Sequence, residues 1–223
     1  ILSHMKYIQI GKSELKVSQI CLGTMTMGVQ NNIEQSKEIM DYAFDNGINF
    51  FDTAEQYPSP STKDLYGVTE RIIGEWLKKK KVRKNIVIAT KMSGPGVPWI
   101  RGGGLQYDIK NIKKAVDDSL KRLNIDYIDL YQLHWPERFF HNFAFDKNIK
   151  LENNYNKLQI ILGTFQELIK EGKIRYIGLS NEDLVGLKAY VDIIKKNNLP
   201  EIISLQNRYN LLFRNYDPEL IEF

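Results

Sequence analysis

The 223-residue sequence holds a single cysteine, Cys21, and only three histidines. One cysteine cannot form a disulfide within the chain, and a cysteine-rich zinc cluster is excluded as well. The few histidines leave little room for other metal sites, so we expect no metal. Long apolar runs are also missing, because no window approaches the roughly 18 uninterrupted apolar residues of a membrane span. We therefore expect a protein that is not embedded in a membrane.

Charge of one sign is not in large excess. The 31 Lys and Arg residues exceed the 27 Asp and Glu residues by only four, although the isoelectric point is about 8.9. The densest basic run, residues 78–84, closes a predicted helix, where the helix dipole favours positive charge. A solvated helix end explains this run better than a phosphate-binding patch, so we expect no nucleic-acid partner.

The composition is that of an ordinary globular protein, with 43% hydrophobic and 26% charged residues. A chain of this length buries enough surface to fold without disulfides. Residues 1–4 resemble an expression-tag remnant before a native Met5, so we predict one domain over residues 5–223. No secretory pattern precedes it, which makes the cytoplasm the expected location. Nothing in the sequence indicates an oligomeric state.

An N-terminal hairpin is predicted from two short alternating segments on either side of Gly11. After it, apolar runs alternate with amphipathic helical segments along the chain. Such alternation predicts parallel strands joined by helical crossovers. The six predicted strands cover residues 20–23, 48–51, 86–89, 127–131, 174–179 and 202–205. The first of them, which ends on a glycine, is expected to be short and buried.

Two α/β architectures fit this pattern, the open doubly wound sheet and the closed (β/α)8 barrel. The first strand is followed by Gly-Thr-Met-Thr-Met-Gly, which is not the GxGxxG loop of a doubly wound sheet. Only a barrel gathers the C-terminal ends of many strands around one mouth. We therefore predict a (β/α)8 TIM barrel, since polar residues follow the apolar runs of five different strands: Asp52, Lys91, His134, Ser180 with Asn181, and Gln206.

The length is short for this fold, which needs eight strands and typically about 250 residues. The pattern of strands and helices accounts for only about six of the eight βα units, and the sequence stops one helix after the sixth strand. We interpret Phe223 as a truncation point, which would leave the first and last strands as open edges.

Four residues at the predicted mouth suit carbonyl chemistry: Asp52, Tyr57, Lys91 and His134. Tyrosine has an ordinary pKa near 10, so a nearby cation such as Lys91 is needed to stabilise its phenolate. Asp52 would keep a buried Lys91 charged, and His134 could hold a carbonyl oxygen. This combination suits protonation of an aldehyde or ketone oxygen during hydride addition.

Each of the four has a purely structural alternative. Asp52 could cap a turn, Tyr57 could be an ordinary loop aromatic, and His134 could be a satisfied buried histidine. Lys91 is the hardest to explain structurally, because a charge directly after an apolar strand points into the mouth. The set is therefore more specific than its members.

Long ordered motifs in the sequence are similar to those of the aldo-keto reductase superfamily, most closely its Tas-like branch. The resemblance extends over residues 5–223. Its motifs include Gly-Ile-Asn-Phe-Phe-Asp-Thr-Ala-Glu-Gln-Tyr at 47–57, Asp-Tyr-Ile-Asp-Leu-Tyr-Gln-Leu-His-Trp-Pro at 126–136 and Gly-Lys-Ile-Arg-Tyr-Ile-Gly-Leu-Ser-Asn at 172–181.

The resemblance implies a (β/α)8 barrel closed at its bottom by the hairpin and NADPH-dependent reduction of a small-molecule carbonyl substrate. It also implies that Tyr57 is the general acid, that Lys91 and Asp52 lower its pKa, and that His134 orients the carbonyl. The cofactor contacts that it implies are Ser180, Asn181 and Gln206 on the nicotinamide carboxamide, with Gly23, Thr24 and Asp52 along the ribose.

The sequence departs from the family pattern in what is absent. The family's aromatic residue at the seventh strand, and its phosphate-gripping groups in the last two βα units, have no counterpart here. The chain thus carries the proton-transfer residues but about half of a dinucleotide site. Two loops, residues 93–107 and 135–155, follow strands at the mouth and are expected to shape the substrate pocket. The second contains Phe139, Phe140, Phe143 and Phe145.

Three other functions are kept as alternatives. One is an NADP(H)-binding regulatory protein that resembles the potassium-channel β-subunits. Another is an aldolase-like enzyme in which Lys91 forms a Schiff base. The third is an inactive barrel fragment that binds no cofactor alone.

Overall fold

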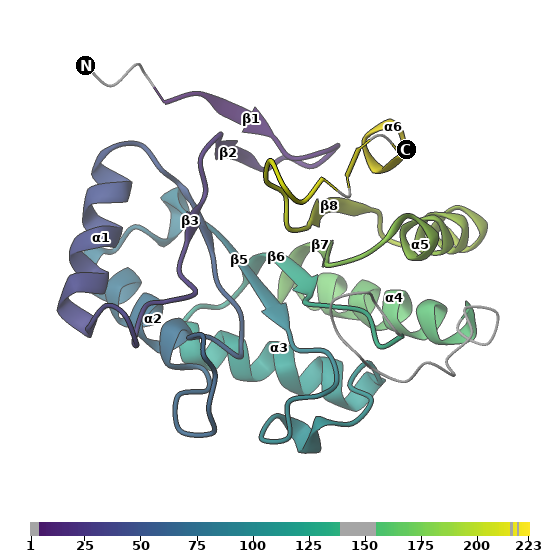
Figure 1. Ribbon diagram of the computed structural model, residues 1–223, viewed down its shortest axis with the longest axis horizontal. Helices are drawn as coiled ribbons and strands as arrows, with labels where there is room; N and C mark the ends of the chain where they lie inside the picture. Colours follow the sequence, from purple (N-terminus) through teal and green to yellow (C-terminus); the bar gives the residue numbers. More distant parts are fainter. Residues whose placement is uncertain (1–4, 139–154, 215, 218) are drawn as a thin grey trace.

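A computed structural model describes residues 5–138, 155–214, 216–217 and 219–223. Its strands and helices alternate as the sequence predicts (Figure 1). The strands are β1 (Tyr7–Gln9), β2 (Lys16–Ser18), β3 (Leu22–Gly23), β4 (Phe50–Asp52), β5 (Val87–Met92), β6 (Ile128–Leu133), β7 (Ile174–Ser180) and β8 (Ile202–Gln206). The helices are α1 (Ile33–Asp45), α2 (Val68–Lys80), α3 (Ile109–Leu123), α4 (Tyr155–Lys170), α5 (Leu184–Asn197) and α6 (Glu219–Glu222), with short 3-10 turns at Arg83–Asn85 and Arg101–Gly103.

The main sheet is parallel, and its spatial order β3-β4-β5-β6-β7-β8 follows the chain order. Helices α1 to α5 form an arc around the outside of this curved sheet (Figure 1). Sequential order with helices on one side is the arrangement of a barrel rather than of a doubly wound sheet. The predicted barrel class is therefore confirmed, in the form of a partial (β/α)8 barrel.

The sheet does not close within the described residues, since no strand pairs with the outer edge of β3 or of β8. The prediction of a buried first strand is wrong for this reason. Strand β3 spans only two residues, and the neighbouring Ile20 is 58% exposed because nothing covers this edge.

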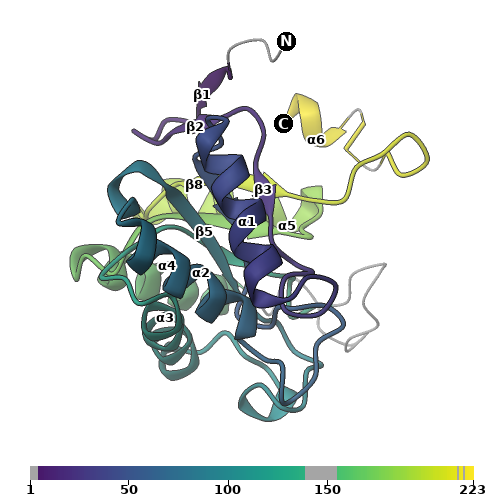
Figure 2. The same cartoon turned by 90° about the vertical axis from the view of Figure 1, so that its left-hand side faces the viewer.

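The N-terminal hairpin lies where it was expected. Strands β1 and β2 pair in antiparallel fashion, and Leu15 and Val17 pack against Val87, at the N-terminal end of β5. Figures 1 and 2 both show the hairpin on the opposite side of the molecule from the long loops that follow β4 and β5. The hairpin therefore covers the bottom of the sheet and leaves the C-terminal strand ends free for a site.

Local sequence signals explain where the helices begin. Asn32 forms a capping box with Gln35, and the side chains of Asp108 and Asp183 accept hydrogen bonds from the first turns of α3 and α5. These bonds satisfy N–H groups that have no partner inside the helix. The apolar faces of the helices pack onto the outer face of the sheet in one continuous core. No helix in the described part of the chain is both long and apolar enough to cross a bilayer.

Close packing of α2 on α3 depends on Gly74. A Cβ at this position would lie 2.6 Å from the carbonyl oxygens of both Arg122 and Leu123. In α4, by contrast, Gly163 has nothing within 4 Å of the corresponding position.

We expect Gly74→Ala to lower the free energy of unfolding by about 1–3 kcal/mol, because the backbone of α3 must move away from the added methyl group. Gly163→Ala is the matched control and should raise it by about 0.5–1 kcal/mol through helix propensity. Urea unfolding of both variants measures the difference. Equal effects at the two positions would contradict this account of the packing.

Candidate active site

The parallel register brings the predicted polar residues together at the C-terminal end of the sheet. Asp52, the last residue of β4, pairs with Gly23 of β3, and Lys91 of β5 pairs with Gln132 of β6. Because successive side chains of a strand point to opposite faces, Lys91 and Gln132 face the interior while Thr90 faces the helices. The contacts described below follow from this alternation.

Lys91 and Asp52 form a buried ion pair. The Lys91 ammonium lies 2.7 Å from Asp52 Oδ2 and donates a second hydrogen bond of 2.8 Å to the carbonyl oxygen of Thr53. The Lys91 side chain is 1% exposed. Burial by itself lowers the pKa of Lys91, but Asp52 and Tyr57 outweigh it, and the pKa of Lys91 lies above its ordinary value. Lys91 is therefore a fixed positive charge at neutral pH.

Two glutamine amides complete the surroundings of Asp52. Gln206 Nε2 lies 3.2 Å from Asp52 Oδ2, and Gln132 Nε2 lies 3.4 Å from Asp52 Oδ1 and 3.2 Å from Gln206 Oε1. Gln132 was not predicted as a site residue. Gln132 lies two residues after the apolar Leu130 on the same strand, so both side chains point to the same face of the sheet. This spacing is the sequence feature that could have placed the Gln132 amide on the inner face.

Tyr57 lies beside this pair, on the loop that follows β4. Its ring centroid is 5.0 Å from the Lys91 ammonium and 5.5 Å from the His134 ring, which it meets edge to face. Asp52, Tyr57, Lys91 and His134 therefore lie in one cluster. Whether each performs its predicted catalytic role stays a prediction.

The pKa of Tyr57 differs from the expectation that Lys91 and Asp52 lower it together. Burial has the largest effect and raises the pKa of Tyr57, Lys91 lowers it, and Asp52 raises it. The net pKa lies above the ordinary value near 10. The carboxylate of Asp52 repels a phenolate, so its help is indirect, through the charge that it maintains on Lys91. In the ligand-free protein Tyr57 is a protonated phenol.

His134 is buried as a neutral imidazole. Burial, followed by the positive charge of Lys91, holds the pKa of His134 well below its ordinary 6.5. Its Nδ1 atom is buried and has no hydrogen-bond partner among the described residues. A neutral imidazole can donate one hydrogen bond and accept another, and the His134 side chain lines the cavity described next.

A cavity of about 460 Å³ opens above Tyr57 and His134. Four of its lining residues belong to residues 93–107, so the expectation that this loop shapes the pocket agrees with the geometry. Of the second loop, Trp135 also lines the cavity, whereas the four phenylalanines at 139–145 lie outside the described residues. The lining residues are Met25, Gln56, Tyr57, Ser59, Ser61, Pro95, Gly96, Val97, Trp99, His134 and Trp135.

The predicted cofactor residues lie next to the ion pair. Thr24 N and Oγ1 both donate to the carbonyl oxygen of Asp52, and Ser180 Oγ donates to the carbonyl oxygen of Gln206. Asn181 has a left-handed backbone, with φ of 52°, and its Nδ2 donates to the carbonyl oxygen of His134. That amide therefore ties the end of β7 to the end of β6.

The chemistry of these groups fits the nicotinamide end of a dinucleotide. Ser180, Asn181 and Gln206 offer one hydroxyl and two amides, which match the donors and acceptors of a carboxamide. A second cavity of about 370 Å³ extends along the inner face of the sheet, from hairpin residues such as Ile8, Ile10 and Val17 up to Asp52, Gln132 and Gln206. The side-chain amides of Asn181 and Gln206 already form hydrogen bonds within the protein, so a bound carboxamide would replace those partners.

Comparison with known proteins agrees with this arrangement. The model of the "Aldo/keto reductase family" matches residues 19–223. The chain belongs to this family. It is 41% identical to "Protein tas" of Escherichia coli over 98% of its own length and 64% of that protein. It is 34% identical to the "Uncharacterized oxidoreductase YrpG" of Bacillus subtilis, over 97% of this chain and 62% of that protein.

Solved structures lead to the same family. The thermostable aldo-keto reductase Tm1743, solved with the inhibitor epalrestat, matches with a TM-score of 0.73 and 27% identity, over 98% of this chain and 68% of that chain. A "Putative aryl-alcohol dehydrogenase" of Schizosaccharomyces pombe is 30% identical over 100% of this chain and 64% of that protein. The chain thus spans slightly less than two thirds of the curated relatives that it matches.

The neutral state of His134 predicts how stability depends on pH. A histidine whose pKa is lowered by folding binds its proton only in the unfolded chain, so its contribution is present above pH 6.5 and is lost as the pH falls. We expect His134→Gln to reduce the loss of unfolding free energy below about pH 6.5, by up to about 1.4 kcal/mol per pH unit. Chemical denaturation at several pH values between 5 and 7 measures both slopes. Equal slopes would show that folding does not lower the pKa of His134.

Proposed function

We propose that this protein reduces uncharged aldehydes or ketones to alcohols, with NADPH as the hydride donor and Tyr57 as the general acid. The observation that carries the proposal is the cluster of a protonated phenol, a charged ammonium and a neutral imidazole at the edge of one cavity. Membership of the aldo/keto reductase family supports it.

Tyr57 is suited to donate the proton. The phenol is protonated at neutral pH, and the Lys91 charge beside its ring stabilises the phenolate that remains after the proton has gone. Asp52 contributes by keeping Lys91 protonated and in place. The lysine that would be needed for Schiff-base chemistry is an uncharged amine. The raised pKa of Lys91 argues against that alternative.

His134 is suited to hold the carbonyl. A neutral imidazole can donate one hydrogen bond to the carbonyl oxygen without competing with Tyr57 for the proton. The His134 ring meets the Tyr57 ring edge to face at 5.5 Å, and both residues line the cavity, which supports this role. The two groups would therefore bind one oxygen between them.

The bound nicotinamide supplies the hydride that reduces the carbonyl carbon. Ser180, Asn181 and Gln206 would hold its carboxamide, and Gly23, Thr24 and Asp52 would lie along its ribose. The choice of NADPH over NADH follows from the resemblance to the family.

The cavity indicates the substrate class. Among the described residues, its lining contains no Lys, Arg, Asp or Glu side chain, and Trp99 and Trp135 contribute flat apolar surface. An ionic substrate would lose its hydration there without gaining a partner. We therefore propose carbonyl compounds with an apolar or aromatic body, and the name of the Schizosaccharomyces pombe relative is in keeping with this.

Tyr57→Phe tests the general acid. We expect it to lower kcat for aldehyde reduction by about 10²–10⁴-fold, because the positioned proton donor is removed while the ring remains. Tyr42→Phe is the control, since Tyr42 lies on α1 and is 70% exposed. NADPH oxidation followed by absorbance, with NADPH binding followed by fluorescence, separates catalysis from binding. Unchanged reduction by Tyr57→Phe would refute the assignment, and binding of NADPH without turnover in the parent would favour the regulatory alternative.

The pH profile of kcat/KM gives a second test. The acid must carry its proton for reduction, and the pKa of Tyr57 is raised, so the rate is retained below that pKa and lost as the pH rises above it. We expect kcat/KM to be flat from about pH 6.5 to about 9, with no histidine inflection, and to fall at higher pH. A change in rate near pH 6.5 would contradict the neutral state of His134.

A further inference from the structure

Four buried charged residues beside the site have no task in the proposed reaction. Glu55 and Glu70 are fully buried, and Arg101 and Arg122 have side chains only 9% and 11% exposed. Arg122 Nε lies 2.6 Å from Glu70 Oε2, and Arg101 pairs with Glu55. The charges balance, yet a buried ion pair often adds little stability compared with apolar residues. A contribution to stability is therefore not a sufficient reason for these four buried charges. Their position next to the site needs an explanation.

Glu55 connects the segment that carries Tyr57 with the C-terminal end of β5, which carries Lys91. It lies two residues before Tyr57, and its backbone N–H donates to the carbonyl oxygen of Lys91. Its carboxylate accepts a bond of 2.7 Å from the backbone N–H of Ser93 and one of 3.2 Å from the Tyr66 hydroxyl. A movement of this carboxylate would thus be transmitted to both Tyr57 and the end of β5.

Arg101 binds the same carboxylate from the far end of the pocket wall. Its guanidinium donates to both Glu55 oxygens, at 2.9 and 2.5 Å, and its Nε donates to Gln106 Oε1 at 2.8 Å. Such a two-pronged contact fixes orientation as well as distance. Between Ser93 and Arg101 lies a pocket wall of four residues that line the substrate cavity: Pro95, Gly96, Val97 and Trp99. Both ends of this wall are therefore tied to one carboxylate.

The backbone at Arg101 supports a positioning role. Its φ of 47° is left-handed, an uncommon and costly conformation for a residue with a Cβ. Residues in such conformations persist where their surroundings over-determine them, and here the side-chain contacts do so.

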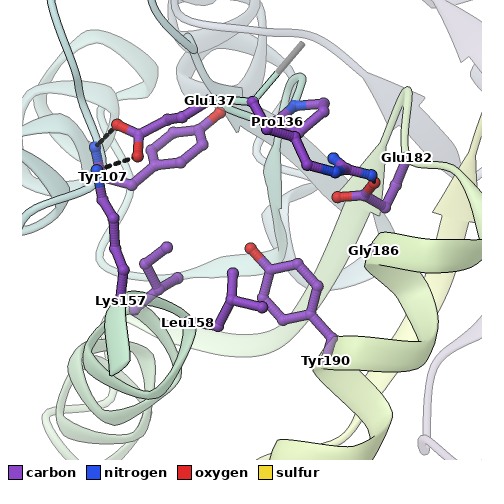
Figure 3. A pocket seen from close by; sticks show the side chains of 10 residues that line it. Tyr107, Pro136, Glu137, Lys157, Leu158, Glu182, Gly186 and Tyr190 are labelled. Carbon is purple, nitrogen blue, oxygen red and sulfur yellow. Dashed lines mark hydrogen bonds and ion pairs between the residues drawn. The ribbon is translucent and has the colours of Figure 1, made fainter. Parts of the chain in front are cut away.

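A second carboxylate ties down the remainder of the loop. Glu137 Oε1 accepts hydrogen bonds from the backbone N–H groups of Gln106 and Tyr107. Figure 3 shows the Glu137 carboxylate directed at Tyr107, across a small cavity from Glu182 and Tyr190. The loop end beyond Arg101 is thus held as well.

Two further bonds act at the start of the wall: Ser93 Oγ donates to Gln56 Oε1 at 3.2 Å, and Trp135 Nε1 donates to the carbonyl oxygen of Pro95 at 3.1 Å. The Glu55–Arg101 pair is the charged link between the far end of the wall and the segment of the acid.

We propose that the Glu55–Arg101 ion pair is a positioning device. It holds two segments in one fixed arrangement, the pocket wall that contains Trp99 (the Trp99 wall) and residues 55–57, which end at Tyr57. This inference rests on the proposed function for its kinetic consequences. Its structural consequence, a restrained segment 94–101, is independent of any activity.

The test compares two neutralised ion pairs. Glu55→Gln/Arg101→Met removes the link but leaves an amide oxygen for Ser93 and no unpaired charge. The matched control is Asp129→Asn/Arg83→Met, because Arg83 and Asp129 also form a pair of 2.8 Å, at the opposite end of the sheet. Asp129 pairs with Arg175 as well, at 3.0 Å, but the Arg175 side chain is 39% exposed, so its charge stays solvated in the control. Arg101→Lys keeps the charge but loses the two-pronged geometry.

Hydrogen exchange measures the structural consequence. We expect the amides of 94–101 to exchange about tenfold faster in Glu55→Gln/Arg101→Met than in the control at equal global stability, because local opening is no longer restrained. Equal exchange in the two double variants would overturn the inference. This readout stands even if the parent chain reduces no aldehyde, an outcome that would refute only the proposed function.

Kinetics measure the positioning effect. The ratio of kcat/KM for 2-naphthaldehyde to that for propanal should fall about tenfold in Glu55→Gln/Arg101→Met, because only the larger substrate depends on the Trp99 wall. The control should keep the parent ratio, and Arg101→Lys should recover part of it. A ratio that is unchanged, or that falls equally in the control, would overturn the positioning role.

Discussion

Lys91 and Asp52 are opposite charges 2.7 Å apart at a place that water scarcely reaches. Removal of either partner would leave an unpaired buried charge, which typically costs about 3–5 kcal/mol. Neighbouring groups of the sheet form hydrogen bonds with both partners of the pair and hold them in place. Thr53 offers its carbonyl oxygen to the ammonium, and Gln132 and Gln206 direct their amides at the carboxylate. The polar layer at the strand ends is thus organised around one pair.

Strand β5 carries two buried charge systems on its two faces. Lys91 points inward to Asp52, whereas Thr90 points outward and donates to Glu70, which belongs to the Glu55–Arg101 network through Arg122. The inward system places a positive charge beside the candidate acid, where it lowers the pKa that burial raises. The outward system holds the loop that forms the pocket wall. Because both share one strand, the acid and the wall have a common rigid support.

Much of this arrangement could be predicted from the sequence. Apolar runs and cap residues located the strands and helices, and the polar residue after each run marked the mouth. The first strand was the weakest prediction, since Ile20 looks buried by composition and yet lies next to an edge of the sheet that no described strand covers. Gln132 was missed because a single amide in an apolar strand carries little signal without knowledge of its neighbours. Glu55 and Arg101 were missed as a pair because 46 residues separate them.

The sequence by itself determined the alternation of strands and helices, the order of the sheet and the identity of the four candidate catalytic residues, because these depend on periodicity and on residue type. Only the tertiary structure decided the charge states. Burial raises the pKa of Tyr57 against the opposing charge of Lys91, whereas burial and Lys91 together keep His134 neutral. The depth of burial depends on packing between segments far apart in the chain. The same holds for the pocket wall, since one carboxylate binds both of its ends only after the strands have paired.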